Sequence, residues 1–540
     1  MVFKKKKPSS AATHKLLIAI FASMAAMSMQ GATPQQARLL VSIMVEGLDS
    51  DYLDLLREQF GQGGFRRLER QGVQMTADYG TPLDATAASA TVMTGASPAL
   101  SGVSSEVNFN RQHFRPTYTY ADASVLGNYT GTGYSPADLR VTTISDELRI
   151  ASGGTNVVYS VAPTPGVAIS MAGHAANSAL WLDEKTGNWA SSTAYKEMPA
   201  SIANRNRAMP LNSRLDTMTW EPSRELASYP ALPGYAKRYG FRHTFPHGAI
   251  ERYDMFMASP FFNREVTEVA QDLINTQKLG THSNATDVLN LCYVLSPYPY
   301  GASTDMRMET MDAYLRLDKD LERLFNDIDR RIGTGNTIVM LAATPPRPQR
   351  RRDDDKWNIP CGEFSTRKAV SLLNIYLMAL YGNGDYVTAY HDGHIYLNHN
   401  LIKENKLNIE DIRSDAASFL SKMTGVDRVF TIDEIVAGHA GENADALRRN
   451  TTVSNAGDLL VMAAPGFEII DDYNNPAAEA HRTGIVQTGG ISTAPAFIMA
   501  PTVAANIIDT PVDARAIAPT VTRLLRIRSP NGASVPAIKL

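Results

Sequence analysis

The stretch Leu39-Leu-Val-Ser-Ile-Met-Val-Glu46 is an unbroken apolar run that ends in an acid, and it decides the fold. Such a run is typical of a parallel strand that is buried on both faces of a sheet. A helix is expected over 50–71, interrupted by Gly61, Gly63 and Gly64. Further short apolar runs occur at 157–162, 287–295, 337–343 and 458–464, with helical spacing at 306–332 and 366–381. This alternation predicts an α/β fold: an open, mostly parallel sheet with helices on both faces and ligand chemistry at the carboxyl ends of the strands.

The composition narrows the possible functions. The 540 residues include 52 Lys and Arg against 55 Asp and Glu, a formal charge of −3. A large sequence-independent nucleic-acid surface needs a clear cationic excess, so this class is excluded. The only two cysteines, Cys292 and Cys361, rule out a disulfide framework and a four-cysteine zinc site. Any metal would therefore have to be held by Asp, Glu and His.

The amino terminus carries the pattern of an export signal. A cationic patch at Lys4–Lys7 precedes an apolar run at 16–29 and the small residues Gly31 and Ala32. We predict a signal peptide over 1–32, with a buried amino-terminal helix as the alternative. The mature protein is then periplasmic or otherwise exported, without a later membrane span.

The rest of the chain, 33–540, is predicted to form one large domain. A hairpin is expected at 180–195, and 210–248 is rich in Pro, Arg and Tyr without clear periodicity. We therefore expect a cap inserted over the sheet, roughly at 165–285, and a smaller insertion roughly at 385–450.

Several motifs resemble those of the alkaline phosphatase superfamily. They are Glu46-Gly-Leu-Asp-Ser-Asp-Tyr52, Met93-Thr-Gly-Ala-Ser-Pro98, Gly173-His-Ala-Ala-Asn177, Tyr314-Leu-Arg-Leu317 and Ile359-Pro-Cys-Gly362. The later ones are similar to the monomeric, phosphate-irrepressible bacterial branch with a threonine nucleophile, related to the type I phosphodiesterase/nucleotide pyrophosphatases. The resemblance runs from about residue 39 to the carboxyl terminus. It implies a two-zinc hydrolase in which a threonine alkoxide attacks phosphorus.

At most of the positions that this resemblance assigns to catalysis, the residues of this chain cannot perform the role that the family requires. The nucleophile position falls on Ala85, whose methyl group cannot attack phosphorus. Thr86 is a poor substitute, because one step along a helix turns the side chain by about 100°. The metal positions fall on Glu46, Pro297, Gly301, Thr344, Pro345 and Thr493, and of these only Glu46 keeps a carboxylate. The phosphate-contact positions fall on Glu106, Thr164 and Gly166, and a negative Glu106 would repel phosphate.

Other polar residues could only form a new site. The acids Asp49, Asp51, Asp305, Glu309 and Asp312 are candidate metal ligands, although a solvated helix face is favoured for the last three. His391, His394 and His399 lie in a strand-like run at 390–400. His391 and His394 are expected on opposite faces of this strand, which disfavours metal binding. His174 is expected to have a structural hydrogen-bonding role. The run Arg350–Asp355 is interpreted as a self-neutralising loop, with a docking epitope as the alternative.

Three functional interpretations remain open. The favoured one is an exported pseudoenzyme that acts as a binding or scaffolding module, without a cofactor. The alternative is a phosphoric-ester hydrolase with an altered metal site, in which Glu46 and neighbouring acids hold zinc. The third is a binder of a neutral or cationic small molecule in the former phosphate pocket. The partner is an unknown protein or small-molecule ligand, and we expect neither nucleic acid nor a membrane span.

Overall fold

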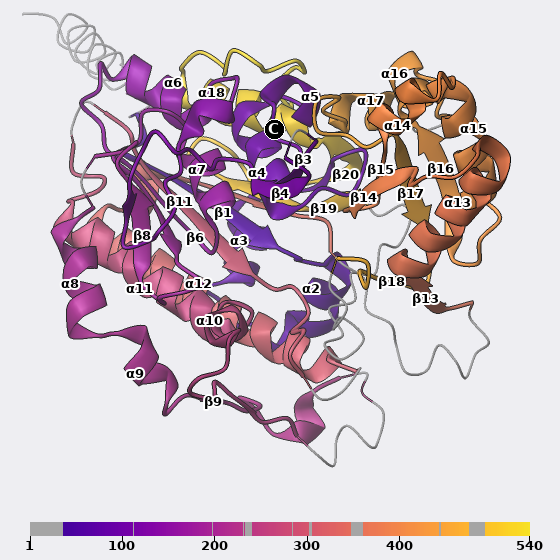
Figure 1. Ribbon diagram of the computed structural model, residues 1–540. Helices are drawn as coiled ribbons and strands as arrows, with labels where there is room; N and C mark the ends of the chain where they lie inside the picture. The colour runs from indigo at the N-terminus through magenta and orange to yellow at the C-terminus, as the bar shows by residue number, and fades with distance from the viewer. Residues whose placement is uncertain are drawn as a thin grey trace, which may run out of the picture. The chain divides into compact units, whose positions relative to one another are not determined.

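The computed structural model describes residues 36–111, 113–196, 198–230, 232, 240–282, 285–301, 305–346, 360–441, 444–474 and 492–540 (Figure 1). The predicted signal peptide, 1–32, lies outside the described residues, as does the charged run 350–355. None of the helices in these ranges has the length and hydropathy that a bilayer span needs.

Strand β1 (Leu39–Glu46) occupies the middle of a ten-stranded sheet. It pairs in parallel with β11 (Asp287–Val294) on one side and β12 (Thr337–Ala343) on the other. Residues 39–45 are all buried, because helices cover both faces of the sheet at this point. The apolar run in the sequence is unbroken because the strand is buried on both faces.

The sheet is parallel in its centre and mixed at its edges. Its order is β20 (Asn506–Asp513), β2 (Val73–Asp78), β19 (Thr493–Met499), β12, β1, β11, β6 (Val158–Ala162), β7 (Ser178–Leu182), β8 (Trp189–Ser192) and β5 (Gly127–Asn128). All neighbours from β12 to β7 are parallel. Strand β19 runs antiparallel to β12 and β2, and β7–β8 is the predicted antiparallel hairpin. The expected α/β class and mostly parallel sheet are confirmed.

Helices lie on both faces of this sheet (Figure 1). One layer contains α4 (Ala85–Thr94), α6 (Ile144–Ala151), α7 (Pro165–Ala172) and α18 (Ile517–Leu525), and the other contains α11 (Pro260–Thr276) and α12 (Arg307–Arg331). The predicted break after β1 separates α2 (Ser50–Leu56) from α3 (Phe65–Gln71). Glycine is required at position 64, since a Cβ there would lie 2.2 Å from an oxygen of Asp318.

The cap is smaller than the predicted range 165–285. That range begins with α7, β7 and β8, which belong to the layered core, and ends with α11, which packs against β11. The chain leaves the sheet only after β8. The segment outside the layers contains α8 (Ala200–Ala208), α9 (Leu211–Leu215), β9 (Thr219–Trp220), η3 (Leu226–Ser228), β10 (His243–Thr244) and α10 (Arg252–Met257).

A second, four-stranded sheet has a hydrophobic core of its own. Its order is β14 (Val387–His391), β15 (His394–Leu397), β17 (Leu459–Ala463) and β16 (Val426–Thr431). The pair β13 (Gly362–Ser365) and β18 (Phe467–Ile470) and the helices α13 (Thr366–Tyr381), α14 (His399–Glu404), α15 (Ile409–Leu420), α16 (Ile432–Ala437) and α17 (Ala444–Asn450) complete this part. The predicted insertion 385–450 is thus too narrow. The run 458–464 is a strand, but of this sheet, because a short apolar run does not specify its partner strand.

Candidate functional site

Several predicted metal positions meet at the carboxyl edge of the central sheet. Glu46 ends β1, and its carbonyl accepts a hydrogen bond of 2.7 Å from the backbone N–H of Leu295, two residues before Pro297. On the other side the backbone N–H of Thr344 donates to Val45 at 3.1 Å. Thr493 begins β19, which runs antiparallel to β12, so it lies at the same edge. The fold therefore brings Glu46, Thr344 and Thr493, three of the predicted metal positions, to one edge of the sheet.

The side chains at this edge do not fit two zinc ions. Ser296 Oγ donates to the Glu46 carboxylate at 3.1 Å, and the backbone N–H of Gly47 donates to the Thr344 hydroxyl at 2.9 Å. Proline and glycine at 297 and 301 offer no side-chain ligand. Within the described ranges no three His, Cys, Asp or Glu side chains gather closely enough to hold a metal ion. A zinc site needs three or four such ligands, so the residues here do not fit the metals that the resemblance implies.

The nucleophile position lies at the start of α4. Asp84 caps this helix by accepting a hydrogen bond of 2.8 Å from the backbone N–H of Ala87. Ala85 follows as the first helical residue and presents only a methyl group. Thr86 is 1% exposed, and its hydroxyl donates to the Glu106 carboxylate. Thr86 therefore points into a hydrogen-bonded pocket and not at open solvent.

The three predicted phosphate-contact positions come together around one carboxylate. Glu106 accepts hydrogen bonds from Thr86 and from the Thr164 hydroxyl at 2.9 Å, and a third from the backbone N–H of Gly166 at 3.2 Å. A Cβ at position 166 would lie 2.0 Å from a Glu106 oxygen, so a larger residue there would have to displace this carboxylate. Glu106 therefore links the predicted phosphate-contact positions 164 and 166 to Thr86 through its own carboxylate. Sequence reasoning missed this role.

Burial makes the acids of this pocket hard to ionise. It raises the pKa of Glu106, and the charge of Glu46 raises it further, while the hydrogen bonds from Thr86, Thr164 and Gly166 oppose the shift. Burial also raises the pKa of Asp84 to about 7, against the hydrogen bonds from Ala87 and from the backbone N–H of Glu106. The hydrogen bond from the backbone N–H of Glu106 measures 2.6 Å and links the segment that carries Glu106 to Asp84 at the start of α4.

Asp84 is expected to make stability depend on pH. Because its pKa rises from 3.8 unfolded to about 7 folded, the folded state holds the proton more tightly, and stability falls as pH rises through this window. When the pH is raised from about 5 to about 7, the free energy of unfolding measured in urea should fall by roughly 2 kcal/mol more for the wild-type protein than for Asp84→Asn. Serine at position 84 also caps the helix but has no titrating group, so Asp84→Ser should show the same flatter dependence of stability on pH as Asp84→Asn. Asp84→Glu keeps a carboxyl group and should keep the slope of the wild-type protein. Parallel profiles for all four proteins would contradict the assignment.

His174 lies outside this pocket and has a structural environment. Its Nδ1 lies 3.0 Å from the Asp146 carboxylate and its Nε2 lies 2.8 Å from the carbonyl of Leu139. The hydrogen bond to Asp146 raises the pKa of His174, against desolvation. Asp146 also accepts from the backbone N–H groups of residues 174 and 175, so these contacts connect α6 to the turn before β7.

The predicted orientation of the histidine cluster is wrong. Residues 387–397 form the β14–β15 hairpin, in which His391 and His394 are direct cross-strand partners and hence share a face. Asp392 and Gly393 form its turn, with φ of 45° and 80°. An Asp-Gly pair between strands is a hairpin signal, and sequence reasoning overlooked it. His391 Nε2 contacts the carbonyl of Val107 at 2.9 Å and His399 Nε2 contacts Asp458 at 2.9 Å, so their bonds go to protein groups.

The solvated-face interpretation of three acids is also wrong. The Asp305 side chain is 4% exposed and pairs with Arg307 at 2.7 Å. Glu309 is 5% exposed and lies 3.1 Å from His243 Nε2, and Asp312 is fully buried. The beginning of α12 is covered by the cap, which sequence alone did not reveal. Of the other two candidates, Asp49 caps α2 through the backbone N–H of Asp51.

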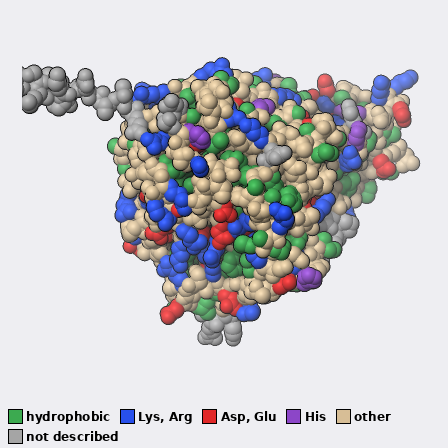
Figure 2. Space-filling view, turned by 90° about the vertical axis from the view of Figure 1, so that its left-hand side faces the viewer, with side chains coloured by type: hydrophobic (Ala, Val, Ile, Leu, Met, Phe, Trp, Pro, Cys, Tyr) green, Lys and Arg blue, Asp and Glu red, His purple; other side chains and the backbone are tan. Residues whose placement is uncertain are grey.

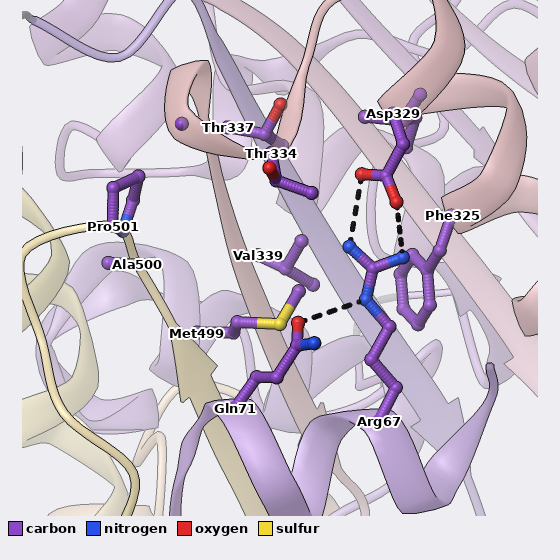
Figure 3. Close-up of a pocket in the computed structure, with 12 residues that line it drawn as sticks. Arg67, Gln71, Phe325, Asp329, Thr334, Thr337, Val339, Met499, Ala500 and Pro501 are labelled. Atoms are coloured by element: carbon purple, nitrogen blue, oxygen red, sulfur yellow. Dashed lines mark hydrogen bonds and ion pairs between the residues drawn. The ribbon is translucent and has the colours of Figure 1, made fainter. Parts of the chain in front are cut away.

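A cavity of about 200 Å³ lies away from this edge, beside the start of β12 and the end of β19 (Figure 3). Arg67 from α3 makes two hydrogen bonds to Asp329, at 2.7 and 3.0 Å, and a third to Gln71 at 3.2 Å. Its guanidinium also lies 5.3 Å from the ring centre of Phe325. The cation is fully engaged within the protein, so these contacts explain packing and not ligand binding.

Charges of both signs are mixed on the face that carries α8 and α9 (Figure 2). Arg205 pairs with Glu265 at 2.7 Å and with Glu268 at 2.6 Å, and Arg214 pairs with Glu265 at 2.8 Å. Burial would raise the pKa of Glu265, but the two arginines hold it at about 2. Arg205 and Arg214 are thus paired with acids of α11. Whether the protein avoids nucleic acid stays a prediction.

The fold and the edge site define the class of protein. Residues 40–490 match the family described as type I phosphodiesterase / nucleotide pyrophosphatase, and the chain belongs to this family. The resemblance to the alkaline phosphatase superfamily and its phosphate-irrepressible branch is confirmed.

Two bacterial alkaline phosphatases are similar to the chain. PhoV from Synechococcus elongatus is 32% identical over 326 residues, which are 58% of this chain and 59% of that protein. PafA from Elizabethkingia meningoseptica is 26% identical over 518 residues, 92% of this chain and 93% of PafA. The crystal structure of wild-type PafA has a TM-score of 0.78 at 24% identity and covers 94% of this chain and 99% of that chain, a likeness in fold.

Proposed function

We propose that this protein is an exported pseudoenzyme of the family, a binding or scaffolding module built on a phosphatase fold. The observation that carries the proposal is the position of Glu106, whose carboxylate accepts hydrogen bonds from Thr86, Thr164 and the backbone of Gly166. An anionic ester would have to displace this carboxylate or share its donors with it. Two negative groups so close together repel each other strongly at low dielectric.

The residue types at the other positions support the same proposal. Threonine-based phosphoryl transfer needs a nucleophilic oxygen and cations that stabilise the entering and leaving oxygens. Ala85 supplies no nucleophile, and Pro297, Gly301, Thr344, Pro345 and Thr493 supply no carboxylate or imidazole. Export is supported by the cationic and apolar pattern of the first 32 residues. The partner is expected to be a protein or a small molecule, and no nucleic acid.

Family membership and the retained Glu46 support a second candidate function, a phosphoric-ester hydrolase with an altered zinc site. Elemental analysis and turnover assays on the purified protein separate the two. A pseudoenzyme should contain well under one zinc per chain and leave aryl phosphate mono- and diesters at the background rate in added zinc. PafA in the same buffer serves as the active control.

Stoichiometric zinc or zinc-dependent turnover would overturn the proposal. In that case Glu46→Ala should abolish the activity, because it removes the one carboxylate retained at a metal position. If turnover persisted in Glu46→Ala, the altered-site hydrolase would be wrong in its present form, and a contaminating enzyme would be the explanation to exclude.

A further inference from the structure

The central parallel strands all start at the edge of the sheet that lies opposite Glu46. β1, β11 and β12 start in register, since Leu39 pairs with Asp287 on one side and with Thr337 on the other. β6 and β7 continue the parallel array, so they start at the same edge. None of the predicted catalytic, metal or phosphate positions lies in the segments that lead into these strands. The use of this edge therefore does not depend on whether the chain hydrolyses esters.

Five cations lie at or beside this edge. Arg38 precedes β1, and Lys278 is exposed in the turn between α11 and β11. Arg149, in the last turn of α6, donates to backbone carbonyls of the loop that leads into β6. Arg330 and Arg331 end α12, and their side chains are 71% and 40% exposed. We call these five residues the amino-edge surface.

Acids close to the amino-edge surface are buried or paired. No Asp or Glu occurs in the segments that lead into β1, β6, β7 and β12, which are 36–38, 152–157, 173–177 and 332–336, nor in the segment 276–286 before β11. Asp287 is fully buried beside His282, and the buried Asp327 is shared between Arg330 and Arg331. Three further acids contact basic side chains: Asp146 with His174, Asp272 with Arg205 and Asp329 with Arg67.

The five cations are therefore in excess over the two buried acids, Asp287 and Asp327. At the far side of the sheet, the exposed Arg70 in the last turn of α3 and the exposed Asp509 in β20 add one charge of each sign. The opposite edge has the other polarity, because Glu46 ends β1 there. A charge asymmetry of this kind orients a protein in the field of an anionic surface, with the cationic edge towards it.

Two exposed isoleucines accompany these cations. Ile150 is 58% exposed and directly follows Arg149. Ile507 is 62% exposed at the start of β20, which pairs in parallel with the start of β2 at Val73. β2 is antiparallel to β19, as is β12, so β2 also starts at this edge. Cations with exposed apolar side chains among them are typical of surfaces that rest on a bilayer, where Lys and Arg contact anionic head groups and apolar side chains enter the interface.

The chain enters the sheet at this same edge, which connects the surface to the predicted export signal. The apolar run of that signal ends at residue 29, and the chain reaches β1 through Arg38. A stretch of this length spans at most about 30 Å. Arg38 therefore comes within about 30 Å of the bilayer while the signal is attached, whereas no part of the chain brings this edge to a soluble polyanion.

We propose that the amino-edge surface binds an anionic phospholipid bilayer, with Arg38, Lys278 and Arg330 contacting the head-group phosphates. The exported protein then stays on the membrane surface after the signal is removed, and the sheet edge that carries Glu46 faces away from the lipid. The inference rests on the proposed export, which fractionation of cells tests separately from lipid binding.

Cosedimentation of the full-length chain with vesicles tests the proposal. Vesicles of equal parts of phosphatidylglycerol and phosphatidylcholine should bind it at least tenfold more tightly than pure phosphatidylcholine, and about 0.5 M salt should abolish the difference. Lys278→Glu/Arg330→Glu should weaken binding to the anionic vesicles at least tenfold, while Arg331 still neutralises the buried acid that both arginines share. Lys403→Glu/Lys422→Glu is the matched control, because it changes the net charge equally at exposed lysines near the four-stranded sheet.

A thermal melt of each variant guards against loss of folding, and both double variants should melt within a few degrees of the wild type. The milder Lys278→Gln alone should weaken binding about fivefold. Equal binding to anionic and neutral vesicles would overturn the proposal, since the apolar run 16–29 would then account for it. Equal binding by the amino-edge and control variants would also overturn it, as would binding to duplex DNA as tight as that to the anionic vesicles.

Discussion

Replacing Glu106 with alanine is expected to lower the free energy of unfolding by about 2–3 kcal/mol and to create an anion-binding pocket. The substitution removes the shared acceptor of Thr86, Thr164 and the Gly166 backbone N–H. The two hydroxyls can rotate towards other acceptors, but the N–H of Gly166 at the start of α7 cannot. The loss is partly offset because a carboxylate with a raised pKa is no longer buried beside Glu46.

Added anions should distinguish this variant from the wild-type protein. Acetate replaces the missing carboxylate chemically, and a ligand that binds only the folded state raises stability with its concentration. We expect acetate, and more weakly phosphate, to raise the melting temperature of Glu106→Ala by several degrees more than that of the wild type, because acetate matches the removed carboxylate in shape and charge and the larger phosphate does not. The measurement is a thermal melt at about pH 6, where Asp84 is still largely protonated.

Glu106→Gln is the matched control for this experiment. The amide has nearly the same shape, so the pocket stays full, and its NH₂ can donate to a hydroxyl oxygen of Thr86 or Thr164 once these rotate. This variant should gain nothing from acetate. If Glu106→Ala were as stable as the wild type and equally indifferent to anions, the carboxylate would not be an internal substitute for a bound anion.

The parts of the fold that sequence predicted well are those with strong periodicity. β1, β12 and α13 were predicted with the bounds that the structure has, because 39–46 and 337–343 are unbroken apolar runs and 366–381 repeats at helical spacing. The strand at 458–464 was predicted but assigned to the wrong sheet. Only Leu459, Val461 and Ala463 are fully buried, and Leu460 and Met462 on the other face are partly covered by a smaller hydrophobic cluster. Because all five residues are apolar, the sequence does not distinguish this strand from one at the centre of the main sheet.

The sequence predicted the site only as a list of separate positions. Motif spacing singled out Ala85, Glu106, Thr164 and Gly166, and the structure brings the last three together, while their role stays a prediction. Their mutual bonds span 58 and 60 residues, and no local pattern encodes contacts at such separations. The same limit applies to a cavity of about 180 Å³ whose walls come from four stretches of chain, at 81–83, 104–109, 391–396 and 447–463.

Asp312 is the second residue whose replacement should have a large effect. It is fully buried on α12, and its carboxylate accepts four hydrogen bonds. The donors are the Trp220 indole at 2.7 Å, the Ser223 backbone at 2.7 Å, the Tyr229 hydroxyl at 2.8 Å and Arg316 Nε at 2.6 Å. Burial raises the pKa of Asp312, but Arg316 and the hydrogen bonds outweigh it and hold the pKa below the usual value. Three of the donors belong to the cap, so this carboxylate anchors the cap to the core.

Asp312→Ala should therefore cost about 3–5 kcal/mol, because it leaves the Arg316 charge and the buried donors without their acceptor. Asp312→Asn keeps the shape and half of the acceptors, so its cost should be about 1–3 kcal/mol. Urea unfolding gives both values. The exposed Lys319→Ala on the same helix is the control and should change stability by less than about 0.5 kcal/mol.

Limited proteolysis reveals where the stability is lost. If Asp312 anchors the cap, trypsin should cut Asp312→Ala within residues 214–224 much faster than the wild type, at Arg214 or Arg224, while the central sheet stays protected. The pH dependence provides a second signature. Since the folded pKa is lowered, the contribution of Asp312 is present above the unfolded value and disappears as pH falls through the folded one. The difference in unfolding free energy between the wild type and Asp312→Asn should accordingly shrink as the pH is lowered. An advantage that stays constant from neutral pH to the acid transition would mean that shape, and not charge, anchors the cap.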